Sequence, residues 1–300
     1  MKDYEELTFA DDFMFCKILQ ENEELCKELT ELVLGRKIGN IVKPEAQKSI
    51  QITADGHGVR FDVYFEDDDK TVYDIEMQKS DTKELPLRSR YYQGMIDLDY
   101  LAKGKGYKDL PDSYIIFLCT FDLFELGYHK YSFVPKCKEV ENLELDDKTN
   151  RIFICSGGDK NDVSEDMKTF IDYLSGRVSD NDLIKRIEQK VKEAIEQKFW
   201  RKEYMTLKEM MQDEFEQGIK QGIEQGIEQG IEQGADKTII GLICKKLSKG
   251  KTIPEIASEI EEAVEKVQEI CDIAKDFAPD YDVDEIYKKY AEMKKATVKG

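Results

Sequence analysis

The sequence predicts an α/β fold in which a mixed central sheet is flanked by helices, with a helical region toward the C-terminus. Residues 60–79 alternate apolar and polar side chains in two arms around a charged turn, which indicates a β-hairpin. Residues 113–120 form a continuous apolar run, as expected of a strand covered on both faces. From Ser179 onward, Glu, Lys and Gln mix with apolar residues at helical spacing. The order of helix, hairpin, helix and buried strand is typical of an α/β domain.

The N-terminal segment predicts one amphipathic helix that starts near Phe9 and stops at Gly35. Thr8 is the expected cap, and Asp11 or Asp12 would lie in the first turn, where negative charge is favourable. The apolar residues that step by three and four along this helix are Phe15, Ile18, Leu19, Leu25, Leu29, Leu32 and Val33.

A first strand should follow over residues 47–54, with residues 55–58 as its turn. His57 lies between the glycines of that turn. A histidine in such a turn is much more often exposed to solvent than a general base.

The hairpin over residues 60–79 has an apolar face and a polar face. The apolar face carries Phe61, Val63 and Phe65 on one arm and Tyr73, Ile75 and Met77 on the other. The polar face carries Arg60, Asp62, Tyr64 and Glu66 against Asp74, Glu76 and Gln78. A register error of one residue would turn all these acids into the core.

The register of the hairpin decides which polar residues meet. If Glu66 pairs with Val72, Asp62 lies opposite Glu76, and Arg60 lies opposite Gln78. Opposed residues of antiparallel strands have Cβ atoms about 4.5–5.5 Å apart. Two carboxylates at that separation repel each other unless a cation lies between them, and Mg²⁺ or Mn²⁺ suits such oxygen ligands. The alternative is an ordinary amphipathic hairpin whose acids face water.

Residues 85–103 predict a helix that begins with Pro86 in its first turn and ends at Gly104–Gly106. Leu87, Tyr91, Met95, Leu98 and Leu101 form its expected buried stripe. Arg88 and Tyr92 are four residues apart and therefore share a neighbouring face. Residues 128–134 and 151–155 predict two further strands, with an edge position possible for both.

Asp62, the charged turn, the Glu76-Met77-Gln78 triplet and the Arg/Tyr-rich helix after it resemble the PD-(D/E)XK nuclease core. More narrowly, the chain resembles the bacterial PD-(D/E)XK nuclease family transposases, relatives of the recombination-promoting nucleases. The opening over residues 8–15 and the Gly-Ile-Glu-Gln repeat are usual in that group, and the resemblance covers roughly residues 5–235. Phe61 replaces the proline that gives the motif its name, and Gln78 replaces the usual lysine.

The resemblance implies a restriction-endonuclease-like core and a set of site residues. Asp62 and Glu76 would bind Mg²⁺ or Mn²⁺, and Gln78 would complete the catalytic motif. Arg88 and Tyr92 would face the DNA phosphate, although an arginine packed over an aromatic ring on the surface explains them equally well. The leading helix sometimes adds an acid, for which Asp12 is the candidate; a plain helix N-terminal charge is its commoner role.

The C-terminal third contains a four-residue repeat. Gly218-Ile219-Lys220-Gln221 precedes three copies of Gly-Ile-Glu-Gln that end on Gly234. Five glycines destabilise an exposed helix by about 5 kcal/mol relative to alanine unless close packing offsets it. The repeat is therefore either a helix-to-helix association surface, which would make the protein a homo-oligomer, or a tolerated linker.

The tail predicts short helices. Thr252 and Glu255 form a capping box before one helix, and a second carries Ala263, Val267, Ile270 and Ala274. Six glutamates along this pair argue against DNA reading and favour a small cap or partner-binding bundle. We expect three regions: a nuclease-like domain over residues 1–176, the long helical region over 177–249, and the tail over 250–300.

Composition restricts the function classes. The net charge of −19 argues against electrostatic capture of nucleic acid by the whole surface. Seven cysteines without a Cys-x-x-Cys pair indicate buried thiols in a reducing compartment, and two histidines make a zinc site improbable. No signal peptide or membrane span is expected, so the predicted location is the cytoplasm.

Two functions are consistent with these residues. The first is a Mg²⁺- or Mn²⁺-dependent DNA endonuclease linked to recombination or mobile elements. The alternative is a catalytically weak or inactive nuclease-fold protein that acts as an oligomeric interaction module. Net acidity, Gln78 and the long helical region motivate the alternative.

Overall fold

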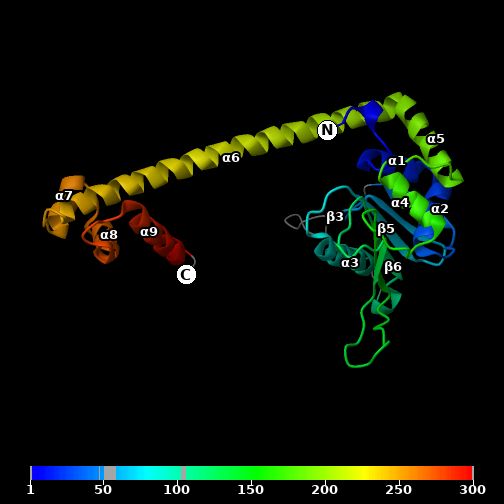
Figure 1. Ribbon diagram of the computed structural model, residues 1–300, viewed down its shortest axis with the longest axis horizontal. Coiled ribbons are helices and arrows are strands. Elements are labelled where there is room, and N and C mark those ends of the chain that lie inside the picture. The colour runs from blue at the N-terminus through cyan, green and yellow to red at the C-terminus, as the bar shows by residue number, and fades with distance from the viewer. Residues whose placement is uncertain (1, 47, 51–58, 103–105, 299–300) are drawn as a thin grey trace. The chain divides into compact units, whose positions relative to one another are not determined.

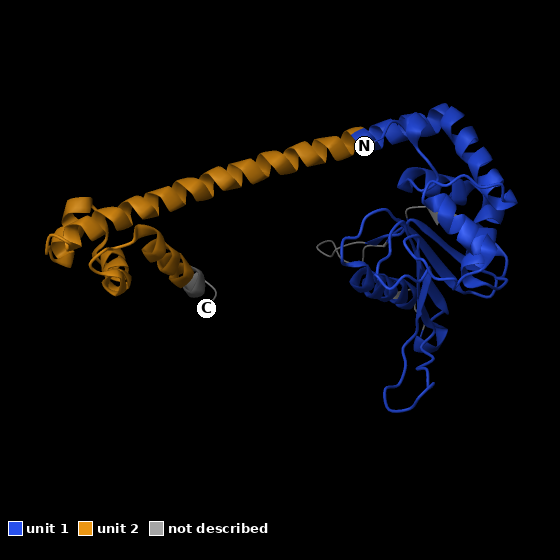
Figure 2. Cartoon of the chain, viewed as in Figure 1, with its two compact units in different colours: residues 1–208 blue, residues 209–300 orange. Residues whose placement is uncertain are grey.

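The computed structural model describes the chain apart from residues 1, 47, 51–58, 103–105 and 299–300. The described residues form two compact units, residues 1–208 and residues 209–300 (Figure 2). Among them, no helix combines the length and apolar character that crossing a membrane requires. The predicted turn with His57 lies outside the described residues, as does most of the strand predicted over 47–54.

The first unit is built on a six-stranded mixed sheet, which confirms the predicted fold class (Figure 1). Its strands, in order across the sheet, are β1 (Ile41–Ala46), β4 (Val63–Asp67), β5 (Val72–Gln78), β6 (Ser113–Cys119), β8 (Thr149–Cys155) and β7 (Lys130–Phe133). β5, β6 and β8 are parallel, and the other neighbouring strands are antiparallel. The apolar run over residues 113–120 is β6, between two parallel neighbours. Of the two later strands, β7 lies at the edge and β8 is interior.

Strand β1 was not predicted, because Pro44 interrupts its strand-like sequence. Proline cannot donate a ladder hydrogen bond and is therefore confined mainly to edge strands, which is the position of β1. A separate small sheet pairs β2 (Ser49–Ile50) with β3 (Val59–Arg60).

Helices cover both faces of the six-stranded sheet, and successive residues of β6 face opposite sides. Ile116 and Leu118 belong to the core that includes α1 (Asp12–Glu21), α2 (Glu23–Leu34), α4 (Glu165–Leu174) and α5 (Asp182–Glu196). Ile115 and Phe117 belong to the core under α3 (Leu85–Ala102). Short 3₁₀ turns occupy Tyr4–Glu6, Tyr107–Asp109 and Lys275–Phe277.

The N-terminal helix predicted as one is two. Its apolar positions are buried as expected, but the helix breaks at Asn22, whose backbone leaves the helical region. The Asn22 side chain donates to the carbonyl of Ile18 over 2.7 Å and so satisfies the end of α1. The helix also begins at Asp12 rather than Phe9. Thr8 is not its cap, because both the N–H and the hydroxyl of Thr8 donate to Asp11.

The predicted buried stripe of α3 is wrong at Leu87, Tyr91 and Leu98, which are exposed, whereas Met95 is buried as predicted. The buried face also includes Tyr92 and Ile96. The reason is tertiary: the buried face of α3 covers the polar side of the hairpin, so polar and aromatic residues share it with apolar ones.

The second unit contains most of α6 (Lys198–Leu247) together with α7 (Ile253–Ile260), α8 (Val264–Ala274) and α9 (Val283–Val298). Ile243, Ile256, Ile270 and Ile286 are fully buried in its separate core. The predicted caps are present at both helical regions. Asn181 accepts from the Leu183 N–H at the start of α5, and the Thr252–Glu255 capping box starts α7. The three-region division proposed from sequence stays a prediction.

Candidate active site

The hairpin bends next to its polar face. Glu66 pairs with Val72, which confirms the predicted register, and the paired residues end at Val63 and Ile75. The chain leaves the strand conformation at Phe61 and Asp62.

Beyond the bend, the arm joins other partners. Arg60 pairs with Ser49 in the small sheet, so it does not lie opposite Gln78. Phe61 packs into the core under α3, not on the face shared by Val63 and Phe65. Arg60 and Phe61 leave their predicted positions because β3 pairs with β2 instead of continuing β4.

The side chains of Asp62 and Glu76 each accept a backbone N–H from the other arm of the hairpin. The Asp62 N–H donates to Glu76 Oε1 over 3.0 Å, and the Met77 N–H donates to Asp62 Oδ2 over 3.0 Å. Glu76 is 1% exposed. Its burial contradicts the alternative in which the hairpin acids simply face water.

Helix α3 places Arg88 and Tyr92 beside Glu76. One guanidinium nitrogen of Arg88 lies 3.2 Å from Glu76 Oε2, and the other donates to Gln78 Oε1 over 3.2 Å. Arg88 also donates to the Tyr92 hydroxyl over 2.7 Å. The spacing of four residues puts both side chains on the helix face toward the hairpin. The structure thus brings together Asp62, Glu76, Gln78, Arg88 and Tyr92.

Asp12, at the start of α1, lies close to Asp62 although the two residues are far apart in the sequence. Asp12, Cys16 and Asp62 each offer one ligand atom within 4.8 Å of the others. Burial is the main cause of the raised pKa of the Cys16 thiol, so this group remains protonated and is a poor ligand for a hard cation. The adjacent Asp11 has a different role: it pairs with Lys2 and Lys79, and its pKa is lowered to about 2 by those hydrogen bonds, against the opposing effect of burial.

Asp74 is a site residue that the sequence reasoning did not single out. It lies on the polar face two residues before Glu76 and is completely buried. Neither of its carboxyl oxygens has a hydrogen-bond partner among the described residues. Its place in the alternating pattern was visible from sequence, but only the covering helix α3 reveals its burial.

Burial raises the pKa of Asp62, Glu76 and Asp74. It is the largest cause for Asp62, whose pKa rises to about 9, and the charges of Glu76 and Asp12 add to it. The pKa of Glu76 rises to about 7, with the Asp62 N–H and Arg88 limiting the rise. The pKa of Asp74 lies well above its usual range, first through burial and then through the charge of Glu76. Without a further cation, these carboxyl groups retain protons near neutral pH.

The group fits a hard divalent cation. Its donors are carboxyl oxygens, which Mg²⁺ and Mn²⁺ prefer. Arg88 is the one cationic side chain in hydrogen-bond contact with Glu76 in the described part of the chain. Asp62, Glu76 and Asp12 could hold the cation, and the unpartnered oxygens of Asp74 show that carboxyl oxygens outnumber hydrogen-bond donors here among the described residues.

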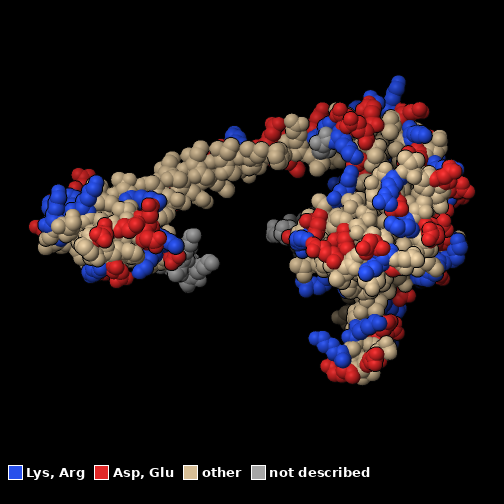
Figure 3. Space-filling model, in the orientation of Figure 1, with Lys and Arg blue, Asp and Glu red and all other residues tan. Residues whose placement is uncertain are grey.

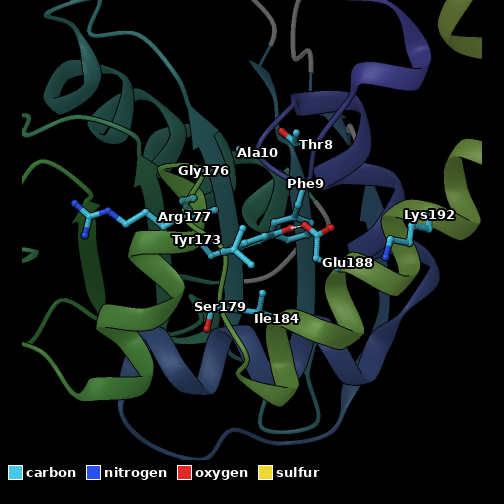
Figure 4. A pocket seen from close by; sticks show the side chains of 12 residues that line it. Thr8, Phe9, Ala10, Tyr173, Gly176, Arg177, Ser179, Ile184, Glu188 and Lys192 are labelled. Carbon is cyan, nitrogen blue, oxygen red and sulfur yellow. Dashed lines mark hydrogen bonds between the residues drawn. The ribbon is translucent and has the colours of Figure 1, made fainter.

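A separate pocket of the first unit, of about 380 Å³, contains none of these acids (Figure 4). Phe9, Tyr173 and Glu188 lie at its centre, and the Tyr173 hydroxyl donates to Glu188 over 2.6 Å. The pocket is therefore not part of the acidic group.

His129 is also separate from the acidic group. It is fully buried, and its Nδ1 lies 2.9 Å from Asp162, which also accepts the backbone N–H groups of His129 and Lys130. These contacts tie the segment before β7 to the loop before α4, which is a structural role.

Residues 10–225 match the model of the PD-(D/E)XK nuclease family transposases. Comparisons with curated proteins and with solved structures give no significant match. The matched range contains the mixed sheet and every acid of the candidate site. The chain therefore belongs to the PD-(D/E)XK nuclease family transposases, and its first unit has a nuclease-type fold.

Proposed function

We propose that the protein is a divalent-metal-dependent DNA endonuclease that uses Mg²⁺ or Mn²⁺ to hydrolyse phosphodiester bonds. The observation that carries this proposal is the convergence of Asp62 and Glu76 from the two arms of the hairpin, in one group with the buried Asp74. Family membership supports a nuclease role and DNA as the substrate.

Each residue of the group has a distinct role in this proposal. Asp62 and Glu76 hold the cation, with Asp12 as a further acid. When bound, the cation activates water and neutralises charge on the scissile phosphate. Gln78 orients the attacking water through its amide. Arg88, with Tyr92 fixing its position, supplies the positive charge that Gln78 lacks in place of lysine.

The site contains a cation that would help an acidic protein to bind DNA. Arg88 is partly exposed and contacts both Glu76 and Gln78. Local positive charge of this kind is what a protein with a net charge of −19 needs at its phosphate-binding surface. We place the activity in recombination or mobile-element transfer, as the family description suggests. We also place it in the cytoplasm, because all seven cysteines are free and six are buried.

The proposal is tested by nicking of supercoiled plasmid DNA with Mg²⁺ or Mn²⁺. Wild-type protein should cut, and addition of EDTA should stop cutting. Asp62→Asn and Glu76→Gln should abolish activity, whereas Asp69→Asn, an exposed acid in the turn of the same hairpin, should leave it unchanged. Absence of metal-dependent cutting, or equal cutting by the site variants, would refute the nuclease proposal.

A second candidate is an oligomeric interaction module on a catalytically weak nuclease scaffold. The exposed apolar side chains of the repeat helix favour it, and they lead us to propose self-association of the chain. This candidate predicts an oligomer with negligible Mn²⁺ affinity by calorimetry. Tight Mn²⁺ binding that Asp62→Asn abolishes would exclude it.

A further inference from the structure

Helix α6 carries a row of exposed apolar side chains at intervals of four residues. We call this row the apolar ridge; it consists of Met211, Phe215, Ile219, Ile223, Ile227 and Ile231. Their exposed fractions lie between 47% and 69%. Ordinary soluble helices bury such residues, so an unpartnered row of six indicates a surface that another molecule covers.

A groove runs beside the ridge. Gly222 lies three residues beyond Ile219, and so about 60° around the helix from it, and the same offset recurs in each copy. A Cβ built on any of Gly218, Gly222, Gly226, Gly230 and Gly234 would meet nothing within 4 Å among the described residues. No side chain of this chain therefore fills the groove.

Charge is turned away from the glycine row. The residue after each repeat isoleucine is charged: Lys220, Glu224, Glu228 or Glu232. Each projects about 160° from the glycines on either side of it, about 100° from its own isoleucine and about 60° from the next isoleucine of the ridge. Figure 3 shows a nearly continuous uncharged surface on the face of this stretch in view. The glycine rows of two copies can therefore meet without bringing their acidic groups together.

We propose that two copies of this chain associate by packing the ridge of each into the glycine groove of the other, crossing near Gly226. Ridge and groove lie side by side on one helix, so an identical helix is complementary to it under two-fold symmetry. Packing along rows four residues apart gives a crossing angle of about −50°. The inference rests on the proposed self-association and is independent of the nuclease activity.

The contact is a short crossing rather than a long coiled coil. Each copy of the repeat rotates the ridge by about 40°, and a partner faces about 120° of a helix, so about three copies can engage. Gly226 is the middle one of the five glycines. A contact of three copies is smaller than an obligate interface, so the dimer should form reversibly at about micromolar concentration.

Sedimentation equilibrium of the full-length chain across a concentration series tests the crossing. Gly226→Leu fills the groove at its centre and should raise the dimer Kd about tenfold or more. The matched control is Gln225→Leu, which adds the same side chain about 100° around the helix from Gly226 and about 160° from the ridge residues Ile223 and Ile227; it should change Kd less than about twofold. Circular dichroism of both variants should show unchanged or higher helicity, since leucine is a better helix former than glycine.

The possible outcomes bear separately on self-association, on the crossing near Gly226 and on the nuclease proposal. A chain that is monomeric at all concentrations overturns both self-association and the crossing. A dimer that Gly226→Leu and Gln225→Leu affect equally overturns the crossing alone. Plasmid nicking bears only on the nuclease proposal, so a dimer that cuts no DNA leaves the crossing intact.

Discussion

The hairpin acids occupy an environment that disfavours their ionised form. Asp62, Asp74 and Glu76 are held close together at the bend and beneath α3, with Arg88 in contact with only one of them. A carboxylate in this position is stabilised either by a proton or by a cation. Proton and metal binding should therefore compete at this site.

The stability of the metal-free protein should fall as pH rises from about 5 to 9. The pKa of Asp62 rises from 3.8 to about 9 on folding and that of Glu76 from 4.5 to about 7. Between the unfolded and folded pKa values the folded state binds more protons than the unfolded state. The stabilisation that these protons give is therefore present at low pH and is lost as pH increases. Thermal unfolding in EDTA at several pH values measures the slope. Asp62→Asn should flatten it, and a slope identical to wild type would contradict the assigned cause.

Under the nuclease proposal, restoring the family's usual lysine should not improve cleavage. Gln78→Lys would place an ammonium group where the Gln78 amide now accepts from Arg88 at 3.2 Å. Repulsion would displace Arg88 from Glu76, and cleavage should fall about tenfold. The double variant Gln78→Lys/Arg88→Gln should recover part of the loss in the same nicking assay. Higher activity of the single variant would show that Arg88 does not replace the lysine.

At the scale of elements, α3 shows how a site changes the usual use of a helix. Its inner face carries the polar and aromatic groups that contact the hairpin acids beside apolar residues such as Ile96, and Leu87, Tyr91 and Leu98 face outward. The buried face is thus defined by what α3 covers rather than by its hydrophobic periodicity.

Two substitutions on α3 distinguish the faces. Ile96→Ala removes a fully buried side chain and should lower the unfolding free energy by about 2–5 kcal/mol. Leu87→Ala removes an exposed side chain of similar size and should change it by less than about 0.5 kcal/mol. Urea denaturation measures both. A large effect of Leu87→Ala would mean that another molecule covers the outer stripe.

At the scale of the whole molecule, the chain has separate hydrophobic cores. Two lie on the faces of the sheet in the first unit, and the third joins α6, α7, α8 and α9 in the second unit. Each unit therefore has its own apolar burial to stabilise it.

Thermal unfolding of the full chain should show two transitions. Ile116→Ala should lower only the transition of the first unit, and Ile270→Ala only that of the second, since each side chain is fully buried in one core. Differential scanning calorimetry resolves the two. A single cooperative transition that both variants shift equally would contradict independent units.

The alternating pattern of residues 60–79 was sufficient to predict the hairpin and, given the pairing of Glu66 with Val72, the closeness of Asp62 and Glu76, but it misplaced Arg60 and Phe61 beyond the bend. Side-chain direction along a strand repeats every two residues, so local sequence determines which side chains share a face. The continuous apolar run of β6 was sufficient to predict an interior strand. A strand that is covered on both faces is expected to have that composition.

Tertiary structure decided which faces meet. The position of Asp12 beside Asp62, the burial of Asp74 and the inward turn of Arg88 depend on segments that are distant in sequence but packed together. The bend at Phe61 likewise depends on β3 finding β2 as its partner. Periodicity assigns residues to a face, whereas long-range packing determines what that face covers, and the acidic site exists only where three such faces converge.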